Sequence, residues 1–217
     1  MTRSPFSAVR PEEALPAADG ADIDLVAAVA ARYHALNGHH PMTTEDDNYV
    51  SSWYVRLEDL AHSRGHDVRE LRRLMLANRL PLPSYIRSDG AQMVANDLLE
   101  LADEAGGFDR LPEWFAQQWP TAVEAVREWD DYLSGRYVCL RSVTPANMRR
   151  KNELCAAIEE ALQHPAAHDE AWLSRVHALA DELDAIEPPF APYDRLRFGG
   201  PISRDRLIDD VRLRFPI

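Results

Sequence analysis

The sequence predicts a mainly α-helical protein: a helical bundle with a winged-helix-like N-terminal part that contains a small β-hairpin. Three observations predict this class. Apolar residues recur every three to four positions along most of the chain, capping residues precede those runs, and Ser88-Asp89-Gly90 has the composition of a hairpin turn. The chain has 217 residues, 46% of them hydrophobic, which is enough to bury one large core or two small ones.

The N-terminal residues divide into an expected tail and a first helix. Residues 1–21 contain three prolines and no apolar period, so we expect a flexible tail. Asp22 is the predicted N-cap of the helix that follows, and Asn37-Gly38 is its predicted end. The apolar positions of this helix are Ile23, Val26, Ala27, Ala30 and Tyr33.

Residues 22–95 form the predicted winged-helix-like region. Within it, Gly65 separates two helices, and Asp67 caps the second with Glu70 three residues later. The hairpin at Ser88-Asp89-Gly90 would be the wing. Residues 44–96 hold seven arginines against eight acids, a charge balance that is poor for binding DNA.

Residues 96–217 are predicted to be helical, with one long interruption. Thr144-Pro145 begins a helix that runs to about residue 163, and an apolar stripe follows over 172–186. Four prolines and Gly199-Gly200 predict a long irregular loop at 187–202, which either closes a site or straps the last helix to the body. Ser203 is the predicted N-cap of that last helix.

The charge distribution argues against one class of function and favours another. A net charge of −12 argues against a protein that binds nucleic acid by broad phosphate neutralisation. Residues 136–151 nevertheless carry five positive charges and no acid, between acid-rich segments at 97–131 and 152–187. Such a basic island is a candidate site for a small anionic metabolite. The alternative is that its cations form salt bridges with the acidic segments.

The helix start at Thr144 is the centre of this candidate site, because backbone amides at a helix N-terminus favour negative charge. Lys151 shares a helical stripe with Met148 and Cys155, so it faces inward. A desolvated Lys151 with a lowered pKa would be a nucleophile or a base. The predicted binding residues are Arg141, Thr144, Asn147, Arg150, Tyr193, Asp194, Arg195 and Arg204.

Other reactive side chains have simpler interpretations beside the functional ones. Cys139 is a candidate nucleophile, but it is first a small buried apolar residue. The three histidines at 34, 39 and 40 precede three acids, which would suit a divalent metal, but a solvated loop is the simpler explanation. We therefore predict no metal site, and no cofactor fingerprint is present.

The location of the protein follows from what the sequence lacks. The longest apolar stretch, 25–31, is too short for a membrane span, and the N-terminus does not have the plan of a signal peptide. The two cysteines are too few for a disulfide framework. We expect a cytoplasmic protein.

Three segments carry a resemblance to a known family: LPLPSYIRSDGAQMV, EWDDYLSGRYVCLRSVTPANMRRK and PFAPYDRLRFGGPISRDR. There the chain resembles an uncharacterised bacterial family labelled as natural-product biosynthesis proteins. The resemblance implies a role in secondary metabolism and assigns no catalytic residue. Together with the basic island, it favours a protein that binds or converts a carboxylate metabolite, by acid–base or group-transfer chemistry if it is an enzyme. The alternatives are a winged-helix DNA-binding regulator, a protein adaptor, or an accessory protein without a site.

Overall fold

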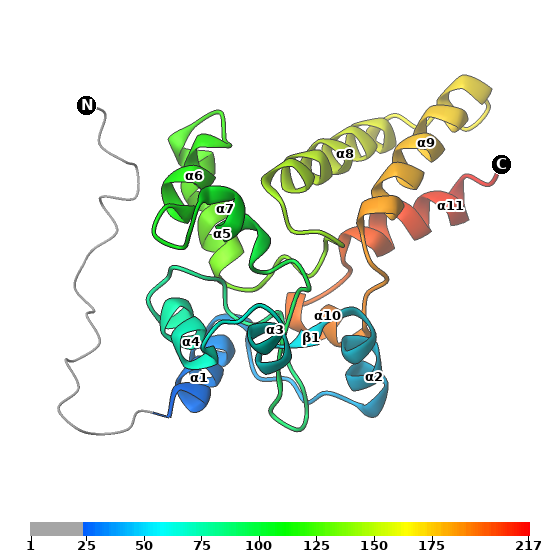
Figure 1. The fold of residues 1–217 in the computed structure, drawn as a ribbon. Helices are drawn as coiled ribbons and strands as arrows, with labels where there is room; N and C mark the ends of the chain where they lie inside the picture. Colours follow the sequence, from blue (N-terminus) through cyan, green and yellow to red (C-terminus); the bar gives the residue numbers. More distant parts are fainter. Residues whose placement is uncertain (1–23) are drawn as a thin grey trace. The chain divides into compact units, whose positions relative to one another are not determined.

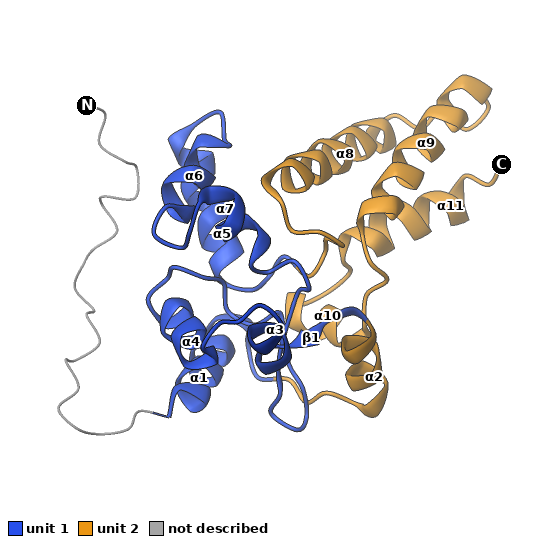
Figure 2. Cartoon of the chain, viewed as in Figure 1, with its two compact units in different colours: residues 1–39, 53–137 blue, residues 40–52, 138–217 orange. Residues whose placement is uncertain are grey.

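The computed structural model describes residues 24–217 (Figure 1), so the predicted tail at 1–21 and the predicted cap Asp22 lie outside the described residues. The fold is mainly helical with a small antiparallel sheet, which confirms the predicted class. The chain forms two compact units (Figure 2). Among the described residues, unit 1 comprises 24–39 and 53–137, and unit 2 comprises 40–52 and 138–217.

The division at 137/138 does not coincide with the predicted one at 95/96. The reason lies in the segment before the hairpin. The Leu82 amide donates to the Leu133 carbonyl, at 2.9 Å, and Gly135 packs against the backbone of Pro83. These contacts attach the helices of residues 100–133 to unit 1.

In the part of the chain that the structure describes, unit 1 contains six helices and one three-stranded sheet, which includes the hairpin. Its helices are α1 (Leu25–Asn37), α3 (Leu57–Ser63), α4 (Val68–Leu76), α5 (Glu100–Ala105), α6 (Leu111–Gln117) and α7 (Ala122–Leu133). Its strands are β1 (Val55–Arg56), β2 (Tyr85–Ile86) and β3 (Gln92–Val94), in the order β1-β3-β2. The predicted hairpin is confirmed, because β2 and β3 pair antiparallel with Tyr85 opposite Met93.

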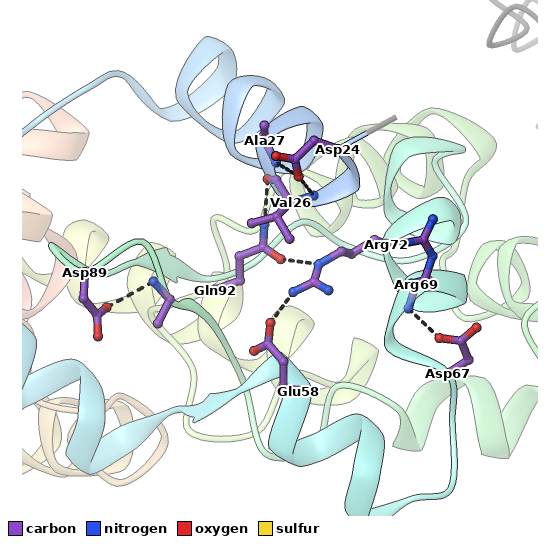
Figure 3. Close-up of polar contacts among 10 residues, drawn as sticks. Asp24, Val26, Ala27, Glu58, Asp67, Arg69, Arg72, Asp89 and Gln92 are labelled. Atoms are coloured by element: carbon purple, nitrogen blue, oxygen red, sulfur yellow. Dashed lines mark hydrogen bonds and ion pairs between the residues drawn. The ribbon is translucent and has the colours of Figure 1, made fainter. Parts of the chain in front are cut away.

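Capping residues set the helix starts of unit 1 (Figure 3). The Asp24 carboxylate accepts from the Val26 and Ala27 amides and begins α1, two residues after the predicted cap. Asp67 accepts from the Arg69 amide and begins α4, as predicted. The pair α3–α4 around Gly65 is therefore confirmed, whereas its winged-helix-like character stays a prediction.

Arg72, on α4, is buried and internally paired, which bears on the DNA-binding alternative. Its guanidinium donates to Gln92 Oε1 at 2.9 Å and forms an ion pair with Glu58 (Figure 3). Gln92 in turn donates to the Val26 carbonyl, so the network joins α3, α4, β3 and α1. This arginine stabilises the core of unit 1 and is not presented to a phosphate backbone.

Unit 2 contains α2 (Thr44–Trp53), α8 (Pro145–Gln163), α9 (Glu170–Ile186), α10 (Pro192–Phe198), the π-helical turn η2 (Asp205–Asp209) and α11 (Asp210–Arg214). Helices α8 and α9 pack along each other (Figure 1). The apolar stripes of α8 and α9 pack against η2 and α11 in one core. Helix α9 confirms the helix predicted from the stripe at 172–186. The core residues are Leu154, Ile158, Trp172, Val176, Ala180, Leu183, Leu207, Ile208, Val211 and Phe215.

Two predictions about residues 187–204 are wrong. The segment is not irregular throughout, because it contains α10. Pro192 stands at the start of that helix, where its missing amide hydrogen costs nothing, and the buried Asp194 carboxylate accepts from the Ala191 amide. Ser203 is not a helix cap either. Its hydroxyl donates to Glu187, and the side chain that accepts from a backbone amide at this helix start is that of Asp205, which binds the Ile202 amide.

Asp46 has a structural role in unit 2. Its buried carboxylate accepts from the Thr43 amide, the Thr43 hydroxyl and the Tyr193 amide, at 2.7–3.1 Å, and so joins the starts of α2 and α10. Over residues 24–217, no group of three or more metal-ligating side chains comes together. Over the same residues, no helix has both the length and the apolar character needed to cross a membrane.

Candidate functional site: a buried lysine–glutamate cluster

The candidate site is built around the N-terminal half of α8. Thr144 caps this helix by accepting from the Asn147 amide, at 3.2 Å, and Pro145 occupies the first turn. The Asn147 side chain donates to the Ser142 carbonyl, at 3.0 Å. The predicted helix start is therefore correct, and the polar groups of both residues serve the local cap.

Lys151 points into unit 2, as its stripe predicts, and meets a carboxylate there. Its Nζ lies 2.6 Å from Glu187 Oε1 and donates to Ser203 Oγ at 3.0 Å. The Ser203 hydroxyl donates to the same Glu187 oxygen, at 2.5 Å. The side chains of Lys151 and Glu187 are 11% and 0% exposed, so this is a desolvated ion pair.

The charge state of Lys151 differs from the expectation of a lowered pKa. Burial does lower the pKa of the ammonium group, but nearby Cys139 and Glu187 outweigh it, and the pKa lies above its usual range. The Lys151 side chain is therefore an ammonium ion at neutral pH. It cannot act as the nucleophile or base that a desolvated lysine would provide.

Both cysteines lie near this ammonium group. Lys151 makes a side-chain hydrogen bond with Cys139, which is half-buried. Cys155 lies one helical turn after Lys151 on α8. Burial raises the pKa of the Cys155 thiol to about 11. The positive charge of Lys151 lowers this pKa by a smaller amount, and the negative charge of Glu187 raises it by a smaller amount.

The raised pKa of Cys155 predicts a loss of stability in alkali. In the unfolded chain the thiol ionises near its usual pKa of 9.0, whereas in the fold it ionises near 11. The fold therefore keeps the full contribution of this thiol below pH 9, and loses it as the pH rises toward 11. Urea unfolding of the wild type and of Cys155→Ala over pH 7–11 measures this effect. We expect the decline over pH 9–11 to be shallower in Cys155→Ala, and equal slopes would contradict the assignment.

Three of the predicted arginines form ion pairs within unit 2, and that of Arg204 is partly buried. Arg150 donates to both Glu182 oxygens at 2.6 Å, Arg195 donates to Asp205 at 2.9 Å, and Arg204 pairs with Asp184. Burial raises the pKa of the Asp184 carboxyl, but hydrogen bonds from Arg212 and Arg204 dominate in sum and the pKa is lowered. Of these contacts, the Arg150–Glu182 pair joins the basic island to an acidic segment, as the salt-bridge alternative predicts.

A second cluster in unit 2 surrounds the phenol of Tyr49, a residue that the sequence analysis did not select. Burial and Asp194 raise the pKa of Tyr49, while Arg141 and Arg204 act in the opposite direction and leave it above its usual range. The phenol donates to the Pro189 carbonyl. Arg141 is exposed, and its backbone amide donates to the Ile186 carbonyl at 2.9 Å.

The structure thus separates the predicted site residues into two groups. Cys139 and Lys151 lie in the lysine–glutamate cluster, whereas Arg141, Asp194 and Arg204 lie around Tyr49. Tyr193 is buried, and its backbone amide donates to the Asp46 carboxylate. Sequence reasoning missed Glu187 and Tyr49. The available signal for Glu187 was an acid at the end of an apolar stripe, directly before Pro188-Pro189.

Comparisons with known proteins give one match. No curated protein and no solved structure matches the chain. The profile of a family of unknown function (DUF6058) matches residues 111–216, a range that includes Cys139, Lys151, Glu187 and Ser203.

Proposed function

We propose that unit 2 binds a small carboxylate-bearing metabolite beside Tyr49, with Arg141 and Arg204 as the cationic partners. The observation that carries this proposal is an unused donor. Arg204 Nη1 is buried and has no hydrogen-bond partner among the described residues, although Nη2 of the same group pairs with Asp184. A buried guanidinium donor without a partner is a costly arrangement that a ligand oxygen would relieve.

The position of Arg141 also supports this proposal. Arg141 lies three residues before Thr144, the cap of the 19-residue helix α8, and its guanidinium acts on the same phenol as Arg204. Arginine presents two parallel donors to a carboxylate, so two arginines beside one phenol favour an anionic oxygen ligand. Lys151 is excluded from this role because Glu187 already neutralises it.

The biological setting is proposed from the resemblance to natural-product biosynthesis proteins. A biosynthetic protein would bind a carboxylic-acid intermediate and either hold it or convert it. For conversion, the Tyr49 phenol is the acid that this cluster offers, and its hydrogen bond to the Pro189 carbonyl would have to be exchanged for one to the substrate. Acid–base chemistry at the bound carboxylate is thus the reaction class that we propose.

A thermal-shift screen of carboxylates tests the proposal, because a ligand that prefers the native state raises the melting temperature. The panel contains aliphatic and aromatic monocarboxylates, dicarboxylates and amino acids. We expect one class to stabilise the wild type. Titration calorimetry of Arg141→Gln and Arg204→Gln should then give binding at least about tenfold weaker, the loss of one charge-assisted hydrogen bond.

Arg206→Gln is the matched control, because Arg206 is exposed and its ion pair with Glu159 is long, at 3.6 Å. This variant should bind as the wild type does. Equal affinity in all three variants would contradict the proposal. Binding of duplex DNA that weakens steeply with salt, without any carboxylate effect, would favour the regulator instead.

A further inference from the structure

One oxygen of the buried Glu187 carboxylate accepts no hydrogen bond. Lys151 and Ser203 both approach the other oxygen, Oε1, at 2.6 and 2.5 Å. Oε2 is buried and has no hydrogen-bond partner within residues 24–217, and the Glu187 side chain as a whole is 0% exposed. A buried acceptor without a donor is unfavourable, because it has lost its contacts with water and gained nothing in exchange. The lysine–glutamate cluster therefore has a place for one more donor.

This acceptor lies close to the unpaired donor of the proposed carboxylate site. Ser203, which binds Glu187, directly precedes Arg204, whose Nη1 is that donor. Consecutive Cα atoms are about 3.8 Å apart. The partners of these two residues are also close, because Arg204 pairs with Asp184, one helical turn before Glu187 at the end of α9. The two unpaired atoms thus belong to side chains that one small molecule could span.

Two more contacts of the carboxylate site fall on the same segment, residues 184–189. The Arg141 amide donates to the Ile186 carbonyl at 2.9 Å, and the Tyr49 phenol donates to the Pro189 carbonyl. Pro189 is two residues after Glu187, and two residues span at most about 7 Å. The groups that we assign to the ligand therefore meet along one short stretch of chain.

The charges around Glu187 Oε2 favour a neutral donor over a cationic one. Lys151 already balances the charge of Glu187, so its ammonium group would repel a second ammonium group and offset the attraction of the carboxylate. A second ammonium group would also lose its water in a buried site, which costs more for a full charge than for a hydroxyl group. A hydroxyl group donates one hydrogen bond and adds no charge, so it suits this oxygen better.

We propose that the ligand is a hydroxycarboxylic acid, whose carboxylate binds Arg204 and whose hydroxyl group donates to Glu187 Oε2. This inference rests on the proposed carboxylate site and adds the second functional group of its ligand. One molecule then pairs a buried donor and a buried acceptor that are both unpaired within the described residues. An acid without the hydroxyl group leaves Oε2 unpaired and therefore binds more weakly.

Sets of acids that differ in a single group test the proposal. Titration calorimetry of the wild-type chain compares propionate, lactate and alanine; phenylpropionate, phenyllactate and phenylalanine; and succinate, malate and aspartate. In the set that binds, we expect the hydroxy acid to bind at least about tenfold more tightly than its unsubstituted parent, which is the value of one hydrogen bond to a charged group. It should also bind more tightly than the amino acid.

Three variants assign the preference to Glu187. Lys151→Met/Glu187→Leu removes the unpaired oxygen without leaving a buried charge behind, and it should bind the hydroxy acid and its parent equally. Arg204→Gln should weaken both acids by the same factor, because both carry the carboxylate. Glu182→Gln is the matched control, because Glu182 is an exposed acid of α9 that pairs with Arg150, and it should keep the wild-type preference. Circular dichroism checks that each variant is folded.

The outcomes distinguish this inference from the proposed function. Equal binding of hydroxy acid and parent by the wild type, or tightest binding of the amino acid, would overturn the inference and leave the carboxylate site standing. A hydroxyl preference that persists in the folded double variant would also overturn it. If none of the nine acids binds the wild type, the carboxylate site itself is wrong, and the inference is wrong with it.

Discussion

Replacement of Lys151 by methionine is expected to lower the free energy of unfolding of unit 2 by about 3–5 kcal/mol, because it leaves a buried carboxylate without its counterion. Glu187 is 0% exposed, and Lys151 is the cation that it contacts. The Ser203 hydroxyl remains as a donor to Glu187, but a neutral donor cannot balance a full charge. Urea unfolding, followed by hydrogen exchange of the α8 and α9 amides, measures the loss where it occurs.

Two further variants separate the ion pair from general effects of the substitution. Arg150→Met lies one residue earlier on α8 and removes an exposed pair with Glu182 and Glu153, so it should cost less than about 1 kcal/mol. The double variant Lys151→Met/Glu187→Leu removes both buried charges and should recover most of the loss. If Lys151→Met and Arg150→Met are equally stable, the buried pair is not what stabilises this part of the fold.

The sequence predicts the inward direction of Lys151 but not its partner. Helical spacing alone places Lys151 on the stripe of Met148 and Cys155. Glu187 lies 36 residues later, and its position depends on how α8 and α9 pack and on where α9 ends at Ile186. Local periodicity contains no information about that crossing. The pKa of Lys151 could not be predicted for the same reason, because its sign depends on Glu187.

The basic island shows a similar limit. A run of cations predicts the sign of the local charge, and residues 136–151 do carry it. The partners are set by tertiary structure: Arg150 reaches Glu182 on α9, across the helix pair. The ligand site that we propose therefore uses the arginine whose donor remains unpaired, Arg204, rather than the centre of the island.

The error over residues 187–204 has a local cause. Prolines and glycines indicate chain breaks, but each is compatible with a short helix at a particular position. Pro192 fits the first turn of α10 and Gly199 fits its left-handed end, at a φ of 74°. Counting these residues predicts a loop, whereas reading their positions predicts a helix of seven residues between them.

Gly135 is the position in unit 1 where a single methyl group has the largest expected effect. The sequence indicates only that this glycine ends a helix. In the structure its φ is +73°, and a Cβ atom there would lie 2.4 Å from the Pro83 carbonyl oxygen and 2.9 Å from that of Leu82. Both atoms belong to backbone that is held by the bond from the Leu82 amide to Leu133. Gly135→Ala therefore has to move main chain in addition to adopting an unfavourable φ.

We expect Gly135→Ala to cost about 1–2 kcal/mol for the left-handed backbone and a further 1–3 kcal/mol for the displaced main chain. Gly65→Ala is the matched control, because its φ is +70° and nothing lies within 4 Å of the added methyl group. It should show the backbone cost alone. Urea unfolding of both variants gives the difference, which is the cost of separating the end of α7 from residues 82–83. Equal destabilisation would mean that the backbone of residues 82–83 moves away from Gly135 without a loss of free energy. Other packing would then attach residues 100–133 to unit 1.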